Sequence, residues 1–162
     1  MKLHRTVWLA APLLLGLAGI QHVLDAPAQA QGSGAGITEI RIERTPCFGF
    51  CPEDVLTLRR DGTAEYEGRR GVDRIGAFQG FVSDRDFARL ARLAEKNRYF
   101  SLREFYGENI ADTPGIDTRI TRRARTKHVF NNADQGPVGL WELERAALGV
   151  GAGIRWEAAK KE

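Results

Sequence analysis

From Ile37 to Phe81 the chain largely alternates hydrophobic and polar residues, which is the period of a strand with one buried face. Four runs carry the pattern, and we expect them as strands over residues 38–44, 55–60, 63–67 and 75–81. Asp61-Gly62 lies between the second and third runs and is typical of a two-residue hairpin turn. Gly76 and Gly80 weaken the fourth run or allow another segment to approach its backbone closely. The pattern therefore predicts a meander of neighbouring strands.

Helical spacing replaces this alternation after Ser83. Apolar residues then recur at intervals of three and four, at Phe87, Leu90, Ala91 and Ala94. Ser83 is suited to accept a hydrogen bond from the first turn, so the spacing predicts a helix over Asp84–Lys96. The aromatic stretch Tyr99–Tyr106 follows, and we expect it to close one end of the core.

The second half returns to alternation and ends in another helix. Two strands are expected over residues 116–121 and 125–130, joined by a turn. Pro137 suits the first turn of a helix, which we expect over Pro137–Leu148. Glycines at 149, 151 and 153 should end that helix, after which Ile154 and Trp156 are expected to fold back on the core.

The order of these elements is four strands, a helix, two strands and a second helix, which indicates an α+β fold. Short hairpin connections favour antiparallel pairing. We therefore expect a mainly antiparallel sheet of five to six strands, with both helices covering one face.

The N-terminal residues have the three parts of a secretory signal. Basic Lys2 and Arg5 precede Val7–Ile20, an apolar run of 14 residues that is shorter than the ~20 a membrane span needs. Ala28-Gln29-Ala30 then provides a small-x-small cleavage site. We expect cleavage after Ala30 and a periplasmic or secreted protein with no membrane attachment after cleavage; an uncleaved anchor is the alternative.

Length and composition fit one globular domain after cleavage. We expect a flexible tether over residues 31–36, a single domain over 37–156 and a charged tail over 157–162. Removing Lys2 and Arg5 from the 24 basic residues and Asp25 from the 21 acidic ones leaves 22 and 20, a net charge of +2. So small a charge does not favour a nucleic-acid partner.

Basic residues nevertheless gather between positions 119 and 127, at Arg119, Arg122, Arg123, Arg125 and Lys127. Solubilising charges on an exposed strand are the simpler interpretation, and contact with an anionic surface or polymer is the functional alternative.

Catalytic patterns are missing from the sequence. His128 is the one histidine after the signal, and no G-x-S-x-G elbow or phosphate-binding loop occurs. Asp112 and Asp117 lack the hydrophobic setting of an acid–base pair. We therefore predict no catalytic residue and no cofactor.

The segment Cys47-Phe48-Gly49-Phe50-Cys51-Pro52 contains both cysteines of the chain. An oxidising compartment favours a structural disulfide, and Gly49 gives the loop the backbone freedom to form one. A reversible redox pair is the alternative, although C-x-x-x-C differs from the C-x-x-C of thioredoxin-like proteins. Metal binding through both cysteines and His128 is a weaker third interpretation, because a tetrahedral site needs three or four ligands.

Phe48 and Phe50 either pack inward, the commoner fate of phenylalanine and the one we expect, or project with Gly49 and Pro52 as a contact for a partner. The leading prediction is a non-enzymatic binding or interaction module for a protein or envelope ligand, with a loop-shaping disulfide. A thiol-redox or redox-sensing protein is the alternative. Neither the ligand nor the oligomeric state follows from the sequence.

Residues 43–52 (ERTPCFGFCP) resemble the signature of a bacterial family, domain of unknown function 6438, in which Pro-Cys-x-Gly-x-Cys-Pro follows the first strand. The similarity spans about Ile37–Trp156 and continues at Asp61-Gly62, Tyr66-Glu67-Gly68, Gly80–Ser83, Phe100-Ser101-Leu102 and the helix after Pro137. Members often have tyrosine where this chain has Asp54, which argues against an aromatic hydroxyl beside the cysteines. The resemblance implies a secreted or envelope setting and no particular activity.

Overall fold

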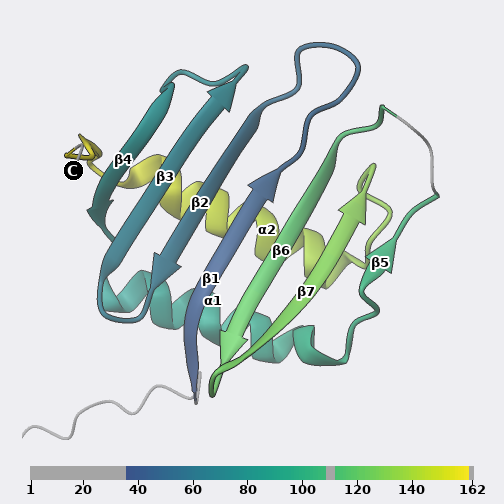
Figure 1. Cartoon of the computed structure of the whole chain (residues 1–162). Coiled ribbons are helices and arrows are strands. Elements are labelled where there is room, and N and C mark those ends of the chain that lie inside the picture. Colours follow the sequence, from purple (N-terminus) through teal and green to yellow (C-terminus); the bar gives the residue numbers. More distant parts are fainter. Residues whose placement is uncertain (1–35, 109–111, 161–162) are drawn as a thin grey trace, which may run out of the picture. The chain divides into compact units, whose positions relative to one another are not determined.

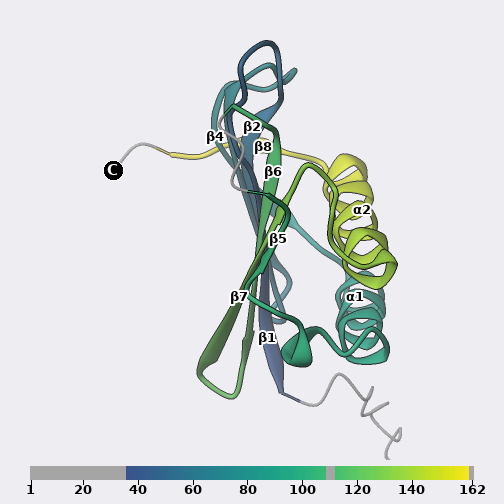
Figure 2. The same ribbon diagram turned by 90° about the vertical axis from the view of Figure 1, so that its right-hand side faces the viewer.

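The computed structural model describes residues 36–108 and 112–160, and the expected signal sequence lies outside these ranges. One mixed sheet carries two helices on the same face (Figures 1 and 2). Its strands are β1 (Ile37–Arg44), β2 (Glu53–Arg59), β3 (Thr63–Arg70), β4 (Gly76–Phe81), β5 (Phe105–Tyr106), β6 (Gly115–Arg122), β7 (Arg125–Asn132) and β8 (Glu157–Ala158). The helices are α1 (Asp84–Lys96), the short 3₁₀ helix η1 (Tyr99–Ser101) and α2 (Val138–Gly153).

The strands follow the order β5-β7-β6-β1-β2-β3-β4-β8, and the β5–β7 pair is the parallel one. The α+β prediction is confirmed, whereas the expected five to six strands become eight. The six long strands are those that alternation predicts. The other two, β5 and β8, have two residues each, too few to produce a readable alternation.

The core lies between the helices and one face of the sheet, with β1 at its centre. Ile40 on β1 pairs with Leu58 on β2 and with Ile120 on β6, and all three side chains are fully buried. Burying such a side chain stabilises the fold by roughly 1.5–3 kcal/mol. Tyr99 in η1 is also fully buried, as expected for the end of the core.

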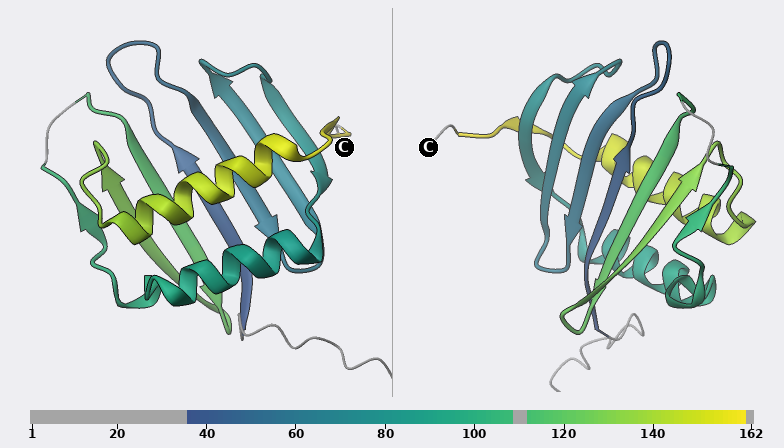
Figure 3. Two further views of the ribbon diagram at one scale, coloured as in Figure 1. Left: turned by 180° about the vertical axis from the view of Figure 1, so that it is seen from behind. Right: turned by 45° about the vertical axis from the view of Figure 1, so that its right-hand side comes forward.

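Helix α1 has the predicted bounds and the predicted buried residues. The Asp86 N–H donates to Ser83 Oγ at 3.1 Å and so caps its first turn. Helices α1 and α2 run side by side across the sheet (Figure 3).

Helix α2 continues to Gly153, so the expected end at Leu148 is wrong. Glycine costs a helix about 1 kcal/mol, and packing outweighs that cost here. A Cβ on Gly151 would lie 2.7 Å from a methyl group of Leu56, so glycine lets the helix approach β2 closely. Ile154 and Trp156 then pack on the core, as expected.

Two further expectations are corrected at the sheet edges. Phe105 is 44% exposed and stacks on Phe130, so the aromatic stretch closes the core only in part. The expected charged tail begins as strand β8, in which Glu157 pairs with Gln79. Pairing covers part of the β4 edge that would otherwise stay open to other chains.

Charged side chains occupy the face of the sheet opposite the helices. Arg59 pairs with Glu39 and Glu65, and Arg69 pairs with Glu43 and Glu67, at N–O distances of 2.7–3.1 Å. Exposed pairs of this kind contribute roughly 0–1 kcal/mol each. Their main effect is to keep this face hydrated.

Candidate functional site

The connection between β1 and β2 is closed by a disulfide between Cys47 and Cys51, whose Cα atoms are 5.7 Å apart. The predicted disulfide is confirmed. We call residues 45–52 the disulfide loop. It rises beyond the ends of the strands at the top of Figure 1. Whether the bond opens reversibly stays a prediction.

Phe48 and Phe50 lie at the tip of this loop with 89% and 100% of their surfaces exposed. The expected inward packing is wrong. The loop extends past the end of the sheet and neither helix runs alongside it (Figure 2), which agrees with the exposure of both rings. The rings are thus presented to solvent by a backbone that the disulfide restrains.

Neighbouring turns contact the backbone of the disulfide loop. The Phe48 N–H donates to the Asp112 carbonyl at 3.1 Å. The turn after β3 approaches so closely that a Cβ on Gly71 would lie 2.7 Å from the Cys51 carbonyl oxygen. These contacts hold the loop backbone against the turns before β6 and after β3.

Replacing both Cys47 and Cys51 by serine is expected to lower the free energy of unfolding by about 2 kcal/mol, because a loop this short removes little entropy from the unfolded chain. Urea denaturation of the oxidised protein and of the double variant measures the difference. Wild-type protein in strong reductant is the matched control and should behave like the variant. Equal stability of all three samples would contradict the prediction.

A buried polar cluster lies immediately behind the loop. Asp54, at 2% exposure, accepts hydrogen bonds from Arg44 Nε at 2.7 Å, from Arg44 Nη2 and from the Tyr66 hydroxyl at 2.9 Å. The three residues come from β1, β2 and β3, which pair in register here. The aromatic hydroxyl that position 54 lacks is supplied to this cluster by Tyr66, which contacts Asp54 itself.

Charges of both signs surround the Tyr66 hydroxyl. Burial, the hydrogen bond to Asp54 and the negative charge of Asp54 together raise the pKa of Tyr66 to about 12. The guanidinium groups of Arg44 and Arg74 act in the opposite direction. Tyr66 therefore stays protonated at neutral pH and donates to Asp54.

This cluster borders a cavity of about 490 Å³ between the sheet, the turn after β3 and the C-terminal half of α2. We call it the Asp54 cavity. Leu56, Leu148 and Trp156 provide apolar walls, and Pro52 of the disulfide loop lies at its edge. A volume and lining of this kind are typical of small-molecule sites.

Comparison of the sequence with models of known protein families identifies the family of this chain. The model of the family "Domain of unknown function (DUF6438)" matches residues 38–150. The chain belongs to this family. A search of curated proteins finds no match. The family match contains the disulfide loop, Asp54 and Tyr66, and it ends before Trp156.

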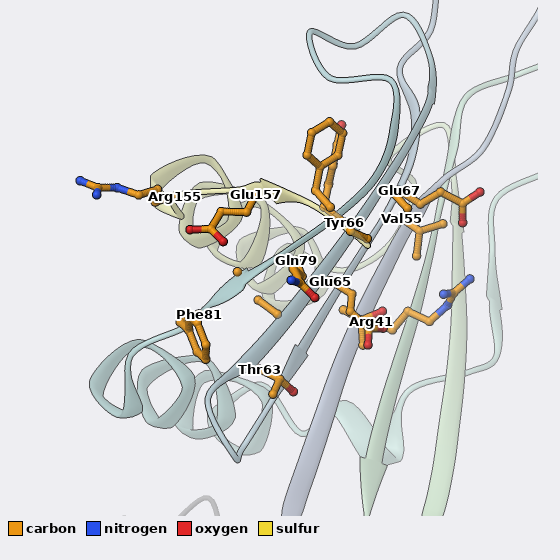
Figure 4. Close-up of a pocket in the computed structure, with 16 residues that line it drawn as sticks. Arg41, Val55, Thr63, Glu65, Tyr66, Glu67, Gln79, Phe81, Arg155 and Glu157 are labelled. Atoms are coloured by element: carbon orange, nitrogen blue, oxygen red, sulfur yellow. The ribbon is translucent and has the colours of Figure 1, made fainter. Parts of the chain in front are cut away.

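A second hollow, of about 630 Å³, lies on the open face of the sheet outside the region that the sequence analysis singled out. Figure 4 shows Glu65, Glu67, Glu157 and the exposed Phe81 ring around it. Glu65 and Glu67 already pair with arginines of the same face. Their charge is therefore largely compensated, and we assign no ligand to this hollow.

The predicted basic hairpin does not form one surface in this family member. Arg119 lies on the open face and pairs with Asp117 at 2.9 Å, whereas Arg122 reaches Glu95 on α1 at 3.2 Å on the other face. Lys127 pairs with Glu104. Arg123 is in the turn and Arg125 begins β7, where both are exposed. Contact with an anionic polymer stays a prediction, with fewer uncompensated charges than the sequence implied.

His128 lies on β7, where its Nε2 is 3.1 Å from Asp117. Over the described ranges no three His, Cys, Asp or Glu side chains are grouped closely enough to hold a metal ion. The cysteine sulfurs are bonded to each other, which removes two of the ligands that the metal interpretation requires.

Sequence reasoning missed Glu144, a fully buried carboxyl group on α2. Its oxygens accept hydrogen bonds from Thr118 Oγ1 at 3.2 Å and from Asn131 Nδ2 at 2.9 Å. Burial raises its pKa to about 7, although these two hydrogen bonds act to lower it. The available signal was its position between Leu140 and Ala147 on the apolar side of the helix.

No helix in the described part of the chain is long and apolar enough to cross a membrane.

Proposed function

We propose that the protein is a periplasmic or secreted, non-enzymatic binding module that contacts a partner protein through Phe48 and Phe50. The observation that carries the proposal is the exposure of both rings, 89% and 100%, on a loop closed by a disulfide. Neighbouring exposed aromatic residues are a frequent feature of protein interfaces. A secreted setting agrees with the signal-like N-terminus and with the disulfide.

The chemistry of the partner follows from the shape of the tip. Two rings on a protruding loop fit an apolar pocket in another protein, which would remove both from water. Each buried ring adds roughly 1.5–3 kcal/mol to binding. The disulfide favours binding because less loop entropy is lost when the partner docks.

Replacing Phe48 and Phe50 by alanine is expected to change the free energy of unfolding by less than about 0.5 kcal/mol, since neither ring packs on the core. The same double variant should bind its partner at least about 100-fold more weakly. Thermal unfolding measures the first effect, and a collapse of the transition would contradict the exposed-contact role.

Site-specific photocrosslinking measures the second effect. A photoreactive phenylalanine analogue is placed at position 48 or 50 of the exported protein in cells, and at Phe81, which is 82% exposed elsewhere on the sheet, as the matched control. One shared crosslinked protein from positions 48 and 50, absent from position 81, is the expected result. The same pattern from all three positions, or no crosslink from the loop, would refute the proposal.

The redox alternative has its own observation, the exposed position of the Cys47–Cys51 loop. It requires a disulfide that mild reductant opens and that exchanges with a partner thiol. Alkylation of protein from the exported fraction, followed by intact mass after graded reductant, distinguishes a structural bond from an exchanging one.

A further inference from the structure

We propose that the Asp54 cavity binds a small organic carboxylate, with its charged group beside Arg44 and Arg74 and its apolar body against α2. This site is separate from the Phe48–Phe50 contact, so either proposal can fail without the other.

The polar side of the cavity has guanidinium N–H groups that are free to donate hydrogen bonds to a ligand. Arg44 uses Nε and Nη2 on Asp54 and makes no hydrogen bond through Nη1 to any described residue. Arg74 also borders the cavity, and no carboxylate in residues 36–108 or 112–160 pairs with it. Both guanidinium groups can therefore donate to a ligand.

An arginine without a carboxylate partner at the cavity favours an anionic ligand. Three charged groups influence the Tyr66 hydroxyl: the guanidinium groups of Arg44 and Arg74 and the carboxylate of Asp54. Asp73 also lies at the rim, with its side chain exposed to solvent. Arg74 forms no ion pair with Asp73 or with any other carboxylate of the described residues, so its guanidinium can pair with a ligand, and a planar carboxylate matches the geometry of guanidinium donors.

The opposite side of the cavity is apolar, so it favours an organic ligand over an inorganic ion. Leu56, Leu148 and Trp156 line it, and the Trp156 ring packs against Tyr66 at a tilt of 41°, with centroids 5.6 Å apart. Gly149 leaves open space, since a Cβ there would meet nothing within 4 Å. An apolar ligand body would fill this space and displace water from apolar surface.

Phenylacetate is a suitable probe, and phenylacetamide is its neutral counterpart. NMR titration of the full protein follows backbone amides and the Trp156 indole N–H, which donates to the Gly151 carbonyl. Phenylacetate is expected to shift these signals and to bind about tenfold more tightly than the amide. Replacing Arg74 by glutamine should remove most of this preference.

Two matched helix variants locate the site. Gly149→Leu fills the cavity and is expected to abolish binding, whereas Gly153→Leu adds the same side chain in open space on the same helix, outside the cavity, and should leave binding unchanged. Both replacements remove a helical glycine, so neither is expected to unfold α2.

Four results would overturn the proposal. They are equal binding of phenylacetate and phenylacetamide, unchanged binding in Gly149→Leu, tighter binding of inorganic phosphate at the same signals, and no shift up to about 10 mM phenylacetate.

Discussion

Glu144→Gln is expected to raise the free energy of unfolding by about 2–3 kcal/mol above pH 7 and to change it little below pH 4.5. The wild-type carboxyl group is fully buried between α2 and the sheet, so its charged form is disfavoured there. Glutamine has nearly the same shape. Its oxygen can accept from Asn131, and its amide can donate to the Thr118 hydroxyl.

The direction of the effect follows from proton binding. The pKa of Glu144 is about 7 in the folded protein, against the ordinary value of 4.5. Between these values the folded state holds a proton that the unfolded state has lost. The contribution of Glu144 to wild-type stability therefore falls as the pH rises from 4.5 to 7 and levels off above 7, whereas the glutamine variant lacks this contribution.

Urea denaturation of both proteins from pH 4 to pH 8 tests this expectation. Glu142→Gln is the matched control, because it makes the same change on the exposed side of the same helix. Its profile should follow that of the wild type. Parallel profiles of wild type and Glu144→Gln would show that burial does not disfavour the Glu144 charge.

Asp54→Ala is expected to lower the free energy of unfolding by about 2–3 kcal/mol. The substitution leaves the Arg44 guanidinium and the Tyr66 hydroxyl without their shared acceptor. Arg44 is 30% exposed and can regain some hydration, so the effect stays below that of a fully buried pair. Denaturation at pH 7 measures the loss.

Glu65→Ala is the matched control for Asp54→Ala. It also removes a carboxylate that an arginine contacts, but this carboxylate is 60% exposed, so a loss under about 1 kcal/mol is expected. Combining Asp54→Ala with Arg44→Met should restore part of the stability, because no unpaired charge remains. Equal losses in Asp54→Ala and Glu65→Ala would contradict a buried role for Asp54.

Local rules in the sequence predict the long elements well. Helix α1 has a cap at Ser83 and a regular apolar spacing, and its bounds agree with the prediction. Helix α2 is longer than predicted because Gly151 packs on Leu56, which is a tertiary contact that no local pattern contains. Strand pairing of β5 with β7 is missed for the same reason.

The disulfide of the candidate site was predictable from the sequence, whereas the positions of the side chains around it were not. The spacing of the two cysteines and the expected oxidising compartment indicated the Cys47–Cys51 bond. The exposure of Phe48 and Phe50 depends on how far the loop extends beyond the sheet, which residue types do not reveal. The cluster of Arg44, Asp54 and Tyr66 requires the register of three strands, so it appears only once the fold is known.

The central position of β1 also determines how the chain can assemble. The β1–β4 meander and the β6–β7 hairpin each form from neighbouring residues, but Ile40 must find Ile120 to join them. Such distant pairing slows folding, because the intervening chain loses entropy before the contact forms. Until then one edge of β1 stays unpaired, with its isoleucines uncovered. A newly made chain is therefore most exposed to aggregation just before β6 docks.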